Sequence, residues 1–341
     1  MKKKGVLLIN LGTPDSPSVK DVRKYLREFL MDKFVIDLPF LSRWMLVHLI
    51  IAPFRGPKSA KIYKKLWNEN GSPLKYFGYR LKELTQVKLG EDYSVELAMR
   101  YQIPSIESVL KQFRNQQISE IIVLPLYPQF ASSTTLSSIS KVEEELKKIN
   151  YSPQVKWINN FLTNPKFIQA FSENGNIHWK TGKYQKILFS YHGVPERHIM
   201  NDCQNGYCKL NESCCSSYNH NNQLCYRAQC FETSRLIALE MGLTNEQYIV
   251  AFQSRLETRS RDPWLKPYAD LIIADLPKDG IKNVLAFSPS FVADCLETTI
   301  EVGVEFKEIF HENGGEKWQL VESLNESPTW VETIVDLIEK V

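Results

Sequence analysis

The segment Ile187–Cys230 has the sequence ILFSYHGVPERHIMNDCQNGYCKLNESCCSSYNHNNQLCYRAQC. It begins as an apolar run, turns at His192-Gly193-Val194-Pro195, and then carries six of the seven cysteines of the chain in a polar loop. The apolar run predicts a buried strand, and a buried strand that ends in a histidine is a common way to build a reactive site. We therefore treat the rest of the chain as scaffold or partner for these two features.

Short apolar runs alternate with amphipathic helical patterns along the whole chain. Strands are expected at Gly5–Leu11, Ser94–Tyr101, Glu120–Leu126, Lys186–Tyr191, Tyr248–Gln253, Asn283–Phe287 and Trp318–Leu324. Helices are expected at Ser18–Leu30, Thr135–Ile149, Asn164–Asn174, Tyr226–Gly242, Cys295–Glu312 and Pro328–Lys340. Such alternation predicts the α/β class, with parallel sheets covered by helices on both faces.

The chain of 341 residues is long enough for two domains of ordinary size, and the boundary between them is expected near Lys156–Asn164. We predict an N-terminal α/β domain at 1–160 and a C-terminal one at 161–341. The second would carry a cysteine-rich insertion at 201–225, and its last helix could pack back on the first domain.

The composition excludes several functional classes. Hydrophobic content of 43% and charge of 24% are typical of a globular protein, and a net charge of +3 does not indicate nucleic-acid binding. The basic start and the short apolar run at Gly5–Leu11 lack the small-residue cleavage site of a secretory signal. We expect a cytoplasmic protein, in which seven cysteines favour metal or redox chemistry over disulfides.

The segment Phe34–Phe54 (FVIDLPFLSRWMLVHLIIAPF) is strongly apolar but is interrupted by charged residues and two prolines. It is too short and too interrupted to span a bilayer. One interpretation is a buried helix hairpin. The other is an apolar lip that covers a hydrophobic substrate. Such a lip would also make peripheral contact with the membrane surface.

His192 and an acidic stripe are the candidate catalytic groups. A histidine after a strand is often structural, yet near neutral pH it can act as a base or a metal ligand. Glu297, Glu301 and Glu305 are spaced four apart, so a helix would stack them on one face, where like charges repel. The stripe is either an ordinary solvated face or a ladder of oxygen ligands for a divalent cation.

The cysteines give the strongest local signal. Cys208, Cys214, Cys215 and Cys225 form C-x5-C-C-x9-C, with Cys203 just upstream. Four thiolates in one loop suit an iron–sulfur cluster or a zinc ion, and zinc is the lesser choice because the paired C-x2-C spacing is missing. Cys230 is expected to be a packed thiol on a helix, and Cys295 lies on the glutamate helix.

Taken together, these motifs resemble the ferrochelatases, which insert Fe²⁺ into protoporphyrin, over nearly the whole chain. The resemblance is carried by Leu8-Ile-Asn-Leu-Gly-Thr-Pro14, Arg55-Gly-Pro-Lys58, Gly71-Ser-Pro73, Leu126-Tyr-Pro-Gln129, Phe189-Ser-Tyr-His-Gly193, Phe252-Gln-Ser-Arg255, Pro263-Trp264 and Asp294-Cys-Leu-Glu-Thr298. It implies two similar Rossmann-like domains of the chelatase type with a porphyrin cleft between them, and it favours the lip interpretation of Phe34–Phe54.

The resemblance also implies roles for individual residues. His192 and Glu297 would be catalytic, with Glu301 and Glu305 as outer steps of the path for the substrate iron. Leu11, Arg100, Tyr101 and Trp157 would line the cleft, and Arg55, Tyr63 and Ser72 would contact the propionates. A [2Fe–2S] cluster would be held by Cys208, Cys214, Cys215 and Cys225, with Cys203 in reserve.

Alternatives remain at the level of the sequence. A chelatase of this kind could act on coproporphyrin or another tetrapyrrole, although Leu11, where coproporphyrin-using relatives tend to carry tyrosine, favours protoporphyrin. A non-catalytic haem-binding protein is the alternative from another class, but such a protein has no need of a histidine opposite a glutamate ladder. The sequence leaves the oligomeric state open, and a homodimer is one option.

Overall fold

The computed structural model describes residues 3–203, 206–255 and 262–341. The chain divides into two compact units. The first unit comprises residues 1–127, 132–160 and 331–341, and the second comprises 128–131 and 161–330. Residues 331–341, which contain most of the last helix, are thus assigned to the first unit. The limits expected from the sequence placed them in the second domain, with the option that the helix packs back on the first.

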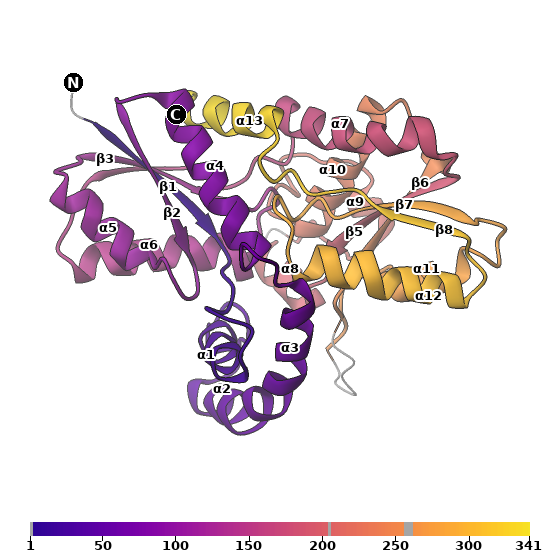
Figure 1. Ribbon diagram of the computed structural model, residues 1–341, viewed down its shortest axis with the longest axis horizontal. Helices are drawn as coiled ribbons and strands as arrows, with labels where there is room; N and C mark the ends of the chain where they lie inside the picture. Colours follow the sequence, from indigo (N-terminus) through magenta and orange to yellow (C-terminus); the bar gives the residue numbers. More distant parts are fainter. Residues whose placement is uncertain (1–2, 204–205, 256–261) are drawn as a thin grey trace. The chain divides into compact units, whose positions relative to one another are not determined.

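The first unit is built on a four-stranded parallel sheet with the strand order β2-β1-β3-β4 (Figure 1). Its strands are β1 (Lys4–Asn10), β2 (Tyr93–Met99), β3 (Glu120–Pro125) and β4 (Gln154–Trp157). Its helical segments are α1 (Val19–Leu30), α2 (Phe40–Met45), η1 (Leu46–Ile51), α3 (Ala52–Leu66), α4 (Pro73–Leu89), α5 (Ile106–Asn115), η2 (Ser132–Leu136) and α6 (Ser137–Lys148).

Successive side chains of β2 show that both faces of this sheet are covered. Ala98 belongs to a buried cluster that includes Phe113 of α5 and Val142 of α6. Leu97, which points to the other face, packs so closely on α4 that a Cβ at Gly78 would lie 2.9 Å from its side chain. A strand buried on both faces needs apolar residues throughout, which is why β1 is buried at six of its seven positions.

The second unit repeats the same plan with the strand order β6-β5-β7-β8, again all parallel. Its strands are β5 (Lys186–His192), β6 (Tyr248–Gln253), β7 (Asn283–Phe287) and β8 (Lys317–Leu320). Its helical segments are α7 (Pro165–Gly182), α8 (Glu196–Asp202), α9 (Glu212–Cys215), α10 (Tyr226–Glu240), η3 (Asn245–Gln247), α11 (Ala269–Asp275), η4 (Leu296–Glu305) and α12 (Phe306–Glu312).

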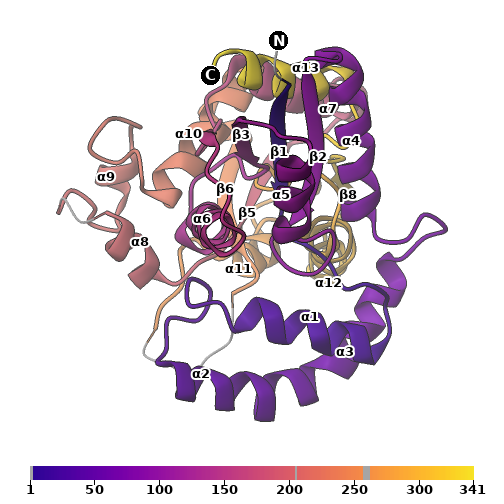
Figure 2. The ribbon, with the colours of Figure 1, turned by 90° about the vertical axis from the view of Figure 1, so that its left-hand side faces the viewer.

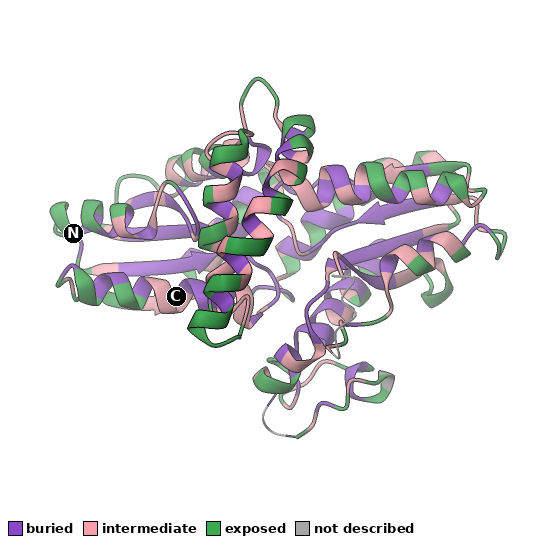
Figure 3. Cartoon of the chain, turned by 90° about the horizontal axis from the view of Figure 1, so that it is seen from below, coloured by how far each residue is buried: buried purple, intermediate pink, exposed green. Residues whose placement is uncertain are grey.

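Helices also cover both faces of the second sheet. Ala286 of β7 packs with Ile273 of α11 and Phe310 of α12 in one buried cluster. Phe287, the next residue, meets α7, where a Cβ at Gly175 would lie 2.3 Å from the phenylalanine ring. Figure 3 shows strands of both units as almost wholly buried, while the helices are buried on one side only. The predicted α/β class with parallel sheets is confirmed.

Two details of the secondary structure differ from the sequence prediction, and a third agrees with it. Strand β4 was not expected, since it is only four residues long and only partly buried. The predicted helix Cys295–Glu312 begins with the wider π-helical turns of η4, seen in the bond from Phe306 N–H to the Glu301 carbonyl. The last helix, α13 (Pro328–Glu339), has the predicted position.

The apolar segment forms an arm of the first unit made of α2, η1 and the start of α3. Figure 2 shows α1 and α3 side by side above α2, and Arg23 of α1 donates to the Pro53 carbonyl at 3.1 Å. Exposed apolar side chains are Leu38, Phe40, Leu41, Trp44, Met45, Leu49, Ile50 and Phe54, the last with 72% of its surface exposed. The buried-hairpin interpretation is therefore wrong. No helix of the described residues is long and apolar enough to cross a membrane.

Candidate functional site

His192 is the last residue of β5 and lies opposite Gln253, the last residue of β6. The two strand ends are joined by a hydrogen bond of 2.8 Å from the Gly193 N–H to the Gln253 carbonyl. A Cβ at position 193 would lie only 2.9 Å from that carbonyl oxygen, so the close approach requires glycine. The turn after β5 is thus fixed against the neighbouring strand.

The imidazole of His192 is held in one orientation. Its Nδ1 lies 2.7 Å from the carbonyl oxygen of Gly193. Because a carbonyl only accepts hydrogen bonds, Nδ1 carries the proton in the neutral ring and Nε2 keeps a free lone pair. His192 is half-buried, so Nε2 is available as a base or a metal ligand.

The segment after β7 places the glutamates. Asp294 accepts from the Ser323 N–H at 3.1 Å and from the Asn325 amide at 2.9 Å, which ties the segment to the chain beyond β8. The Cys295 N–H then donates to the Thr298 hydroxyl at 2.9 Å and caps η4. Glu297 therefore stands in the first turn of η4, where the helix end favours a negative charge.

Glu301 is held by two neutral donors. Its Oε2 accepts from Gln253 Nε2 at 3.0 Å and from Ser254 Oγ at 2.6 Å. Gln253 Nε2 also donates to the Glu297 carbonyl at 3.0 Å, and Gln253 Oε1 accepts from the buried Ser190 hydroxyl at 2.6 Å. Among the described residues, Glu301 and Glu297 form no ion pair with a lysine or arginine.

Burial raises the pKa of Glu301 above its ordinary value. The Ser254 hydrogen bond and the charge of His192 act in the opposite direction, and repulsion from Glu297 adds to the rise. Glu301 thus interacts electrostatically with both predicted catalytic residues. The structure brings His192, Glu297 and Glu301 together, and Glu305, one turn further along η4, is exposed to solvent.

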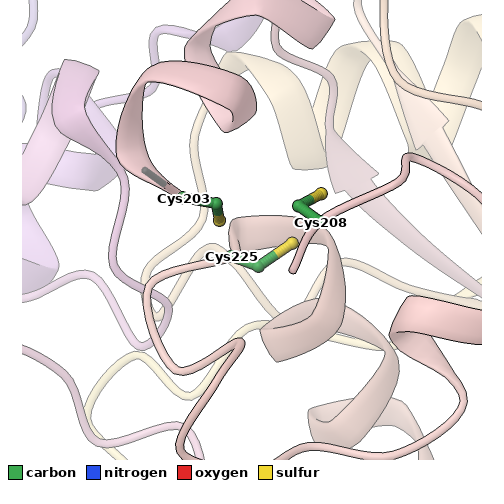
Figure 4. A group of neighbouring side chains, drawn as sticks. All are labelled: Cys203, Cys208 and Cys225. Carbon is green, nitrogen blue, oxygen red and sulfur yellow. The ribbon is translucent and has the colours of Figure 1, made fainter. Parts of the chain in front are cut away.

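The cysteine loop forms a second site in the same unit. We call Cys203, Cys208, Cys214, Cys215 and Cys225 the thiol cluster; all five are buried and none forms a disulfide. The Sγ atoms of Cys203, Cys208 and Cys225 lie within 4.8 Å of one another (Figure 4), and those of Cys214 and Cys215 are 3.7 Å apart. Contact with Cys203 lowers the pKa of Cys208, and contact with Cys225 lowers the pKa of Cys215.

Two features of the thiol cluster bear on the expected ligand set. Cys203, expected only in reserve, stands in the central group of three sulfurs. Cys214 Sγ instead accepts from the Lys209 N–H and lies 3.3 Å from the Asn211 carbonyl, so its sulfur is bonded to its own loop. Of the predicted insertion 201–225, residues 204 and 205 lie outside the described residues.

In the first unit, the predicted cleft residues Arg100 and Tyr101 belong to a hydrogen-bond network around the buried Asp32. Asp32 Oδ2 accepts from Arg100 at 2.5 Å, from the Tyr101 hydroxyl at 2.9 Å and from Ser137 at 2.5 Å. Burial raises the pKa of Tyr101, whose side chain has no exposed surface. The structure therefore does not support Tyr101 as a wall of a cleft.

The ferrochelatase family model matches residues 3–341. The chain belongs to the ferrochelatase family. A ferrochelatase of Coxiella burnetii (strain Dugway 5J108-111) is 46% identical over 99% of this chain and 94% of the relative. A ferrochelatase of Legionella pneumophila (strain Lens) is 43% identical and covers 99% of both chains. Family membership makes the chain a metal chelatase that inserts iron into a porphyrin in haem biosynthesis.

Solved structures support the fold alone. The structure of SirB from Bacillus subtilis with Fe³⁺ aligns with a TM-score of 0.53 over 99% of this chain and 95% of that one, at 10% identity. The CbiX structure, titled as the terminal enzyme of sirohaem biosynthesis in denitrifying bacteria, aligns with a TM-score of 0.50 over 99% of both chains, also at 10% identity. The chelatase type of fold predicted for this ferrochelatase is confirmed.

The other predicted porphyrin contacts differ in accessibility. Leu11, directly after β1, is half-buried, and Trp157 packs partly against the core of the first unit. Ser72 is 3% exposed with its hydroxyl bonded to Thr13 at 3.0 Å, and Tyr63 is also buried. Arg55 is the exposed member of the propionate set. Leu11, Arg100, Trp157 and Arg55 thus keep accessible surface for a ligand of this ferrochelatase, whereas Tyr63, Ser72 and Tyr101 are buried.

Sequence reasoning assigned no role to several residues that organise the ferrochelatase site, although Gln253 and Ser254 belong to the motif Phe252-Gln-Ser-Arg255. Gln253 and Ser254 hold Glu301, and Ser190 holds Gln253. A signal was present for Ser190, because it is a polar residue inside an otherwise apolar strand and a buried hydroxyl needs a partner. Ser254 gave no such signal, since its left-handed backbone (φ 62°) appears only in the fold.

Proposed function

We propose that this ferrochelatase inserts Fe²⁺ into protoporphyrin IX, a lyase reaction, with His192 and Glu297 as its catalytic residues. Insertion exchanges two pyrrole N–H protons for the metal ion, so the site must accept protons and attract a cation. The combination of one histidine and two adjoining carboxylates in the second unit suits both tasks.

The orientation of His192 carries the proposal. With Nδ1 committed to the Gly193 carbonyl, the lone pair of Nε2 is free to accept a pyrrole proton. Glu297 offers carboxylate oxygens to the incoming Fe²⁺. Glu301, whose pKa burial raises, takes up a proton more readily than an ordinary glutamate and can pass it towards the exposed Glu305.

Replacing His192 tests this assignment. His192→Ala should lose at least about 100-fold in the insertion rate while porphyrin binding, followed by porphyrin absorbance, is kept. His311→Ala is the matched control, because the Nδ1 of that exposed histidine also contacts a carbonyl, Gly315, at 3.0 Å. Substantial insertion activity in His192→Ala would refute the role of His192.

The accessible residues of the first unit support protoporphyrin as the substrate. Leu11 is apolar where a polar ring substituent would need a partner, and the exposed Arg55 can pair with a propionate. Rates of Fe²⁺ insertion into protoporphyrin and coproporphyrin, compared at equal concentration, test the preference. A faster reaction with coproporphyrin would overturn it.

We also propose that the thiol cluster holds a [2Fe–2S] group. Such groups are bound by four cysteine thiolates, and five buried thiols are present. Cys203, Cys208 and Cys225 would be ligands, and Cys215, which contacts Cys225, would be the fourth. When bound, the group supplies one-electron redox chemistry, which insertion does not need, so a structural or sensing role follows.

Iron and sulfide analysis of anaerobically purified variants tests this ligand set. Cys203→Ser should lose the bound iron and sulfide, whereas Cys214→Ser should keep both. A protein that holds zinc and no sulfide would contradict the proposal, and loss of the group only in Cys214→Ser would restore the set expected from the sequence.

Finally, we propose that the exposed apolar arm makes peripheral contact with the inner face of the cytoplasmic membrane. Eight exposed apolar side chains within residues 38–54 give this arm more apolar surface than a monomeric soluble protein normally exposes in one segment. Phe54→Ser should weaken sedimentation with phospholipid vesicles. Val87→Ser, at an equally exposed position on α4, is the control and should not.

A further inference from the structure

The hydroxyl of Tyr226 joins the two segments that carry the proposed catalytic residues. It lies 3.0 Å from the carbonyl oxygen of His192 and 3.1 Å from the hydroxyl of Ser290, on the segment between β7 and Glu297. Because a carbonyl only accepts, the Tyr226 hydroxyl donates to His192 and accepts from Ser290. Tyr226 is 5% exposed, so water does not replace it easily.

This contact completes the anchoring of one peptide group. The N–H of the His192–Gly193 peptide donates to the Gln253 carbonyl at 2.8 Å, and its C=O accepts from Tyr226. Both polar ends of the peptide are therefore held, one by β6 and one by α10. The Gly193 carbonyl, which fixes the imidazole through Nδ1, follows directly in the chain. The orientation of the imidazole therefore depends on this peptide.

Tyr226 is also the residue next to Cys225. It is the first residue of α10, and Cys225, whose Sγ belongs to the thiol cluster, directly precedes it. On the other side, α8 begins at Glu196, shortly after His192, and is followed by Cys203 of the same cluster. The thiol cluster therefore links the ends of two helices that both lead to the His192 turn.

We propose that Tyr226 is a positioning residue for His192 and that it transmits the state of the thiol cluster to the insertion site. The proposal rests on the proposed function, in which His192 takes part in the reaction. When the thiols hold the start of α10 in place, Tyr226 holds the His192 peptide. When they do not, the imidazole loses its fixed orientation.

The first test removes only the hydroxyl. Tyr226→Phe should lower kcat by at least about tenfold, because a small misplacement of a reacting group is costly, while KM for porphyrin changes less than about twofold. Tyr191→Phe is the matched control, since its equally buried hydroxyl contacts Ser234 at 2.8 Å and not His192. It should leave kcat unchanged. Equal kcat values for Tyr226→Phe and wild type would overturn the proposal.

The second test observes His192 directly. The imidazole C–H resonances of the six histidines are recorded by NMR without porphyrin or substrate iron, and His192→Ala assigns the signal. Tyr226→Phe should shift the His192 signal, and Tyr191→Phe should not. Tyr226→Phe with an unmoved His192 signal would overturn the positioning role.

The third test concerns the thiol cluster. Cys225→Ser should shift the His192 signal and lower kcat in the wild-type background, and should add little to either effect when Tyr226→Phe is already present. Additive effects would overturn the transmission through Tyr226. If His192→Ala itself remains active, the proposed function has failed. If His192→Ala is inactive while Tyr226→Phe behaves as wild type, only this inference has failed.

Discussion

Asp32 in the first unit is a buried carboxylate and Glu301 in the second is a half-buried one, and their surroundings are opposite. Asp32 meets the guanidinium of Arg100 at 2.5 Å, and its side chain is 4% exposed. Glu301 accepts hydrogen bonds from the neutral side chains of Gln253 and Ser254, and among the nearby charges Glu297 repels it and His192 attracts it. The first carboxylate is compensated by the permanent charge of an arginine, whereas the second has no lysine or arginine as a partner in the part of the chain that the structure describes.

The difference indicates which carboxylate is structural and which is functional. A buried charge is costly unless it is paired, so a fold that keeps an unpaired one must gain something else from it. In a ferrochelatase that gain is the ability to attract Fe²⁺ and to handle protons. The comparison predicts opposite responses to neutralising each carboxylate.

The largest expected effect is on the stability of the first unit. Asp32→Asn leaves the Arg100 charge buried and uncompensated, which should lower the free energy of unfolding by about 3–5 kcal/mol. Urea denaturation measures the change. The control is Asp275→Asn, which removes an exposed pair with Lys278 and should cost at most about 1 kcal/mol. A similar cost for both variants would show that Asp32 is not specially compensated.

Neutralising Glu301 should instead affect turnover. Glu301→Gln should lower kcat by about 100-fold, because an amide can neither take a proton nor offer a carboxylate oxygen to Fe²⁺. Steady-state insertion assays at saturating porphyrin measure the loss. A variant with near-wild-type kcat would show that this carboxylate has no part in the reaction.

The same variant has a predicted pH dependence of stability. The pKa of Glu301 is raised in the folded protein, so the folded state binds more protons than the unfolded state as the pH rises above the ordinary glutamate value of 4.5. Stability is therefore lost as the pH rises through the folded pKa. Glu301→Gln removes this loss and should be at least as stable as wild type at neutral pH. Thermal unfolding at several pH values measures it, and a lower melting temperature would count against the raised pKa.

A smaller effect is expected at Ser254. Its hydrogen bond lowers the pKa of Glu301, so removing the hydroxyl should raise that pKa further and move the acid limb of the pH–rate profile to higher pH. Ser254→Gly is the suitable change, because glycine accepts the backbone φ of 62° at this position. The loss of kcat at neutral pH should stay below about tenfold. A shift of the acid limb to lower pH would be the wrong sign.

The smallest effect is expected at Glu305, which is exposed. Glu305→Gln should raise KM for Fe²⁺ about two- to fivefold and leave KM for porphyrin unchanged, since a solvated charge attracts a cation only weakly. High salt should reduce the difference between variant and wild type. Unchanged iron kinetics at low salt would remove Glu305 from the path.

Much of the fold could be predicted because the strands are buried on both faces. Runs such as Tyr248–Gln253 and Asn283–Phe287 match the observed strands residue for residue. Strand β4 could not be predicted, since four residues of which none is buried carry no period. The exposure of the arm was one of two interpretations, and only the family resemblance favoured it, because periodicity within Phe34–Phe54 does not say whether anything covers it.

The site was predictable where function depends on residue type, and not where it depends on contacts. His192 and the glutamate stripe could be named from spacing, and η4 keeps Glu297 and Glu301 together despite its wider turns. The burial of Tyr101 and the central place of Cys203 depend on packing that no local pattern encodes. Tyr226 had no sequence signal except its place next to Cys225.

One paired experiment separates the functional carboxylate from the structural one: kcat and the free energy of unfolding measured together for Glu301→Gln and Asp32→Asn. The predicted result is a crossed pattern. Glu301→Gln loses turnover and keeps its stability, and Asp32→Asn loses stability while the folded molecules keep their turnover. If Glu301→Gln is destabilised as much as Asp32→Asn and still turns over at the wild-type rate, the unpaired carboxylate is structural and the account is wrong.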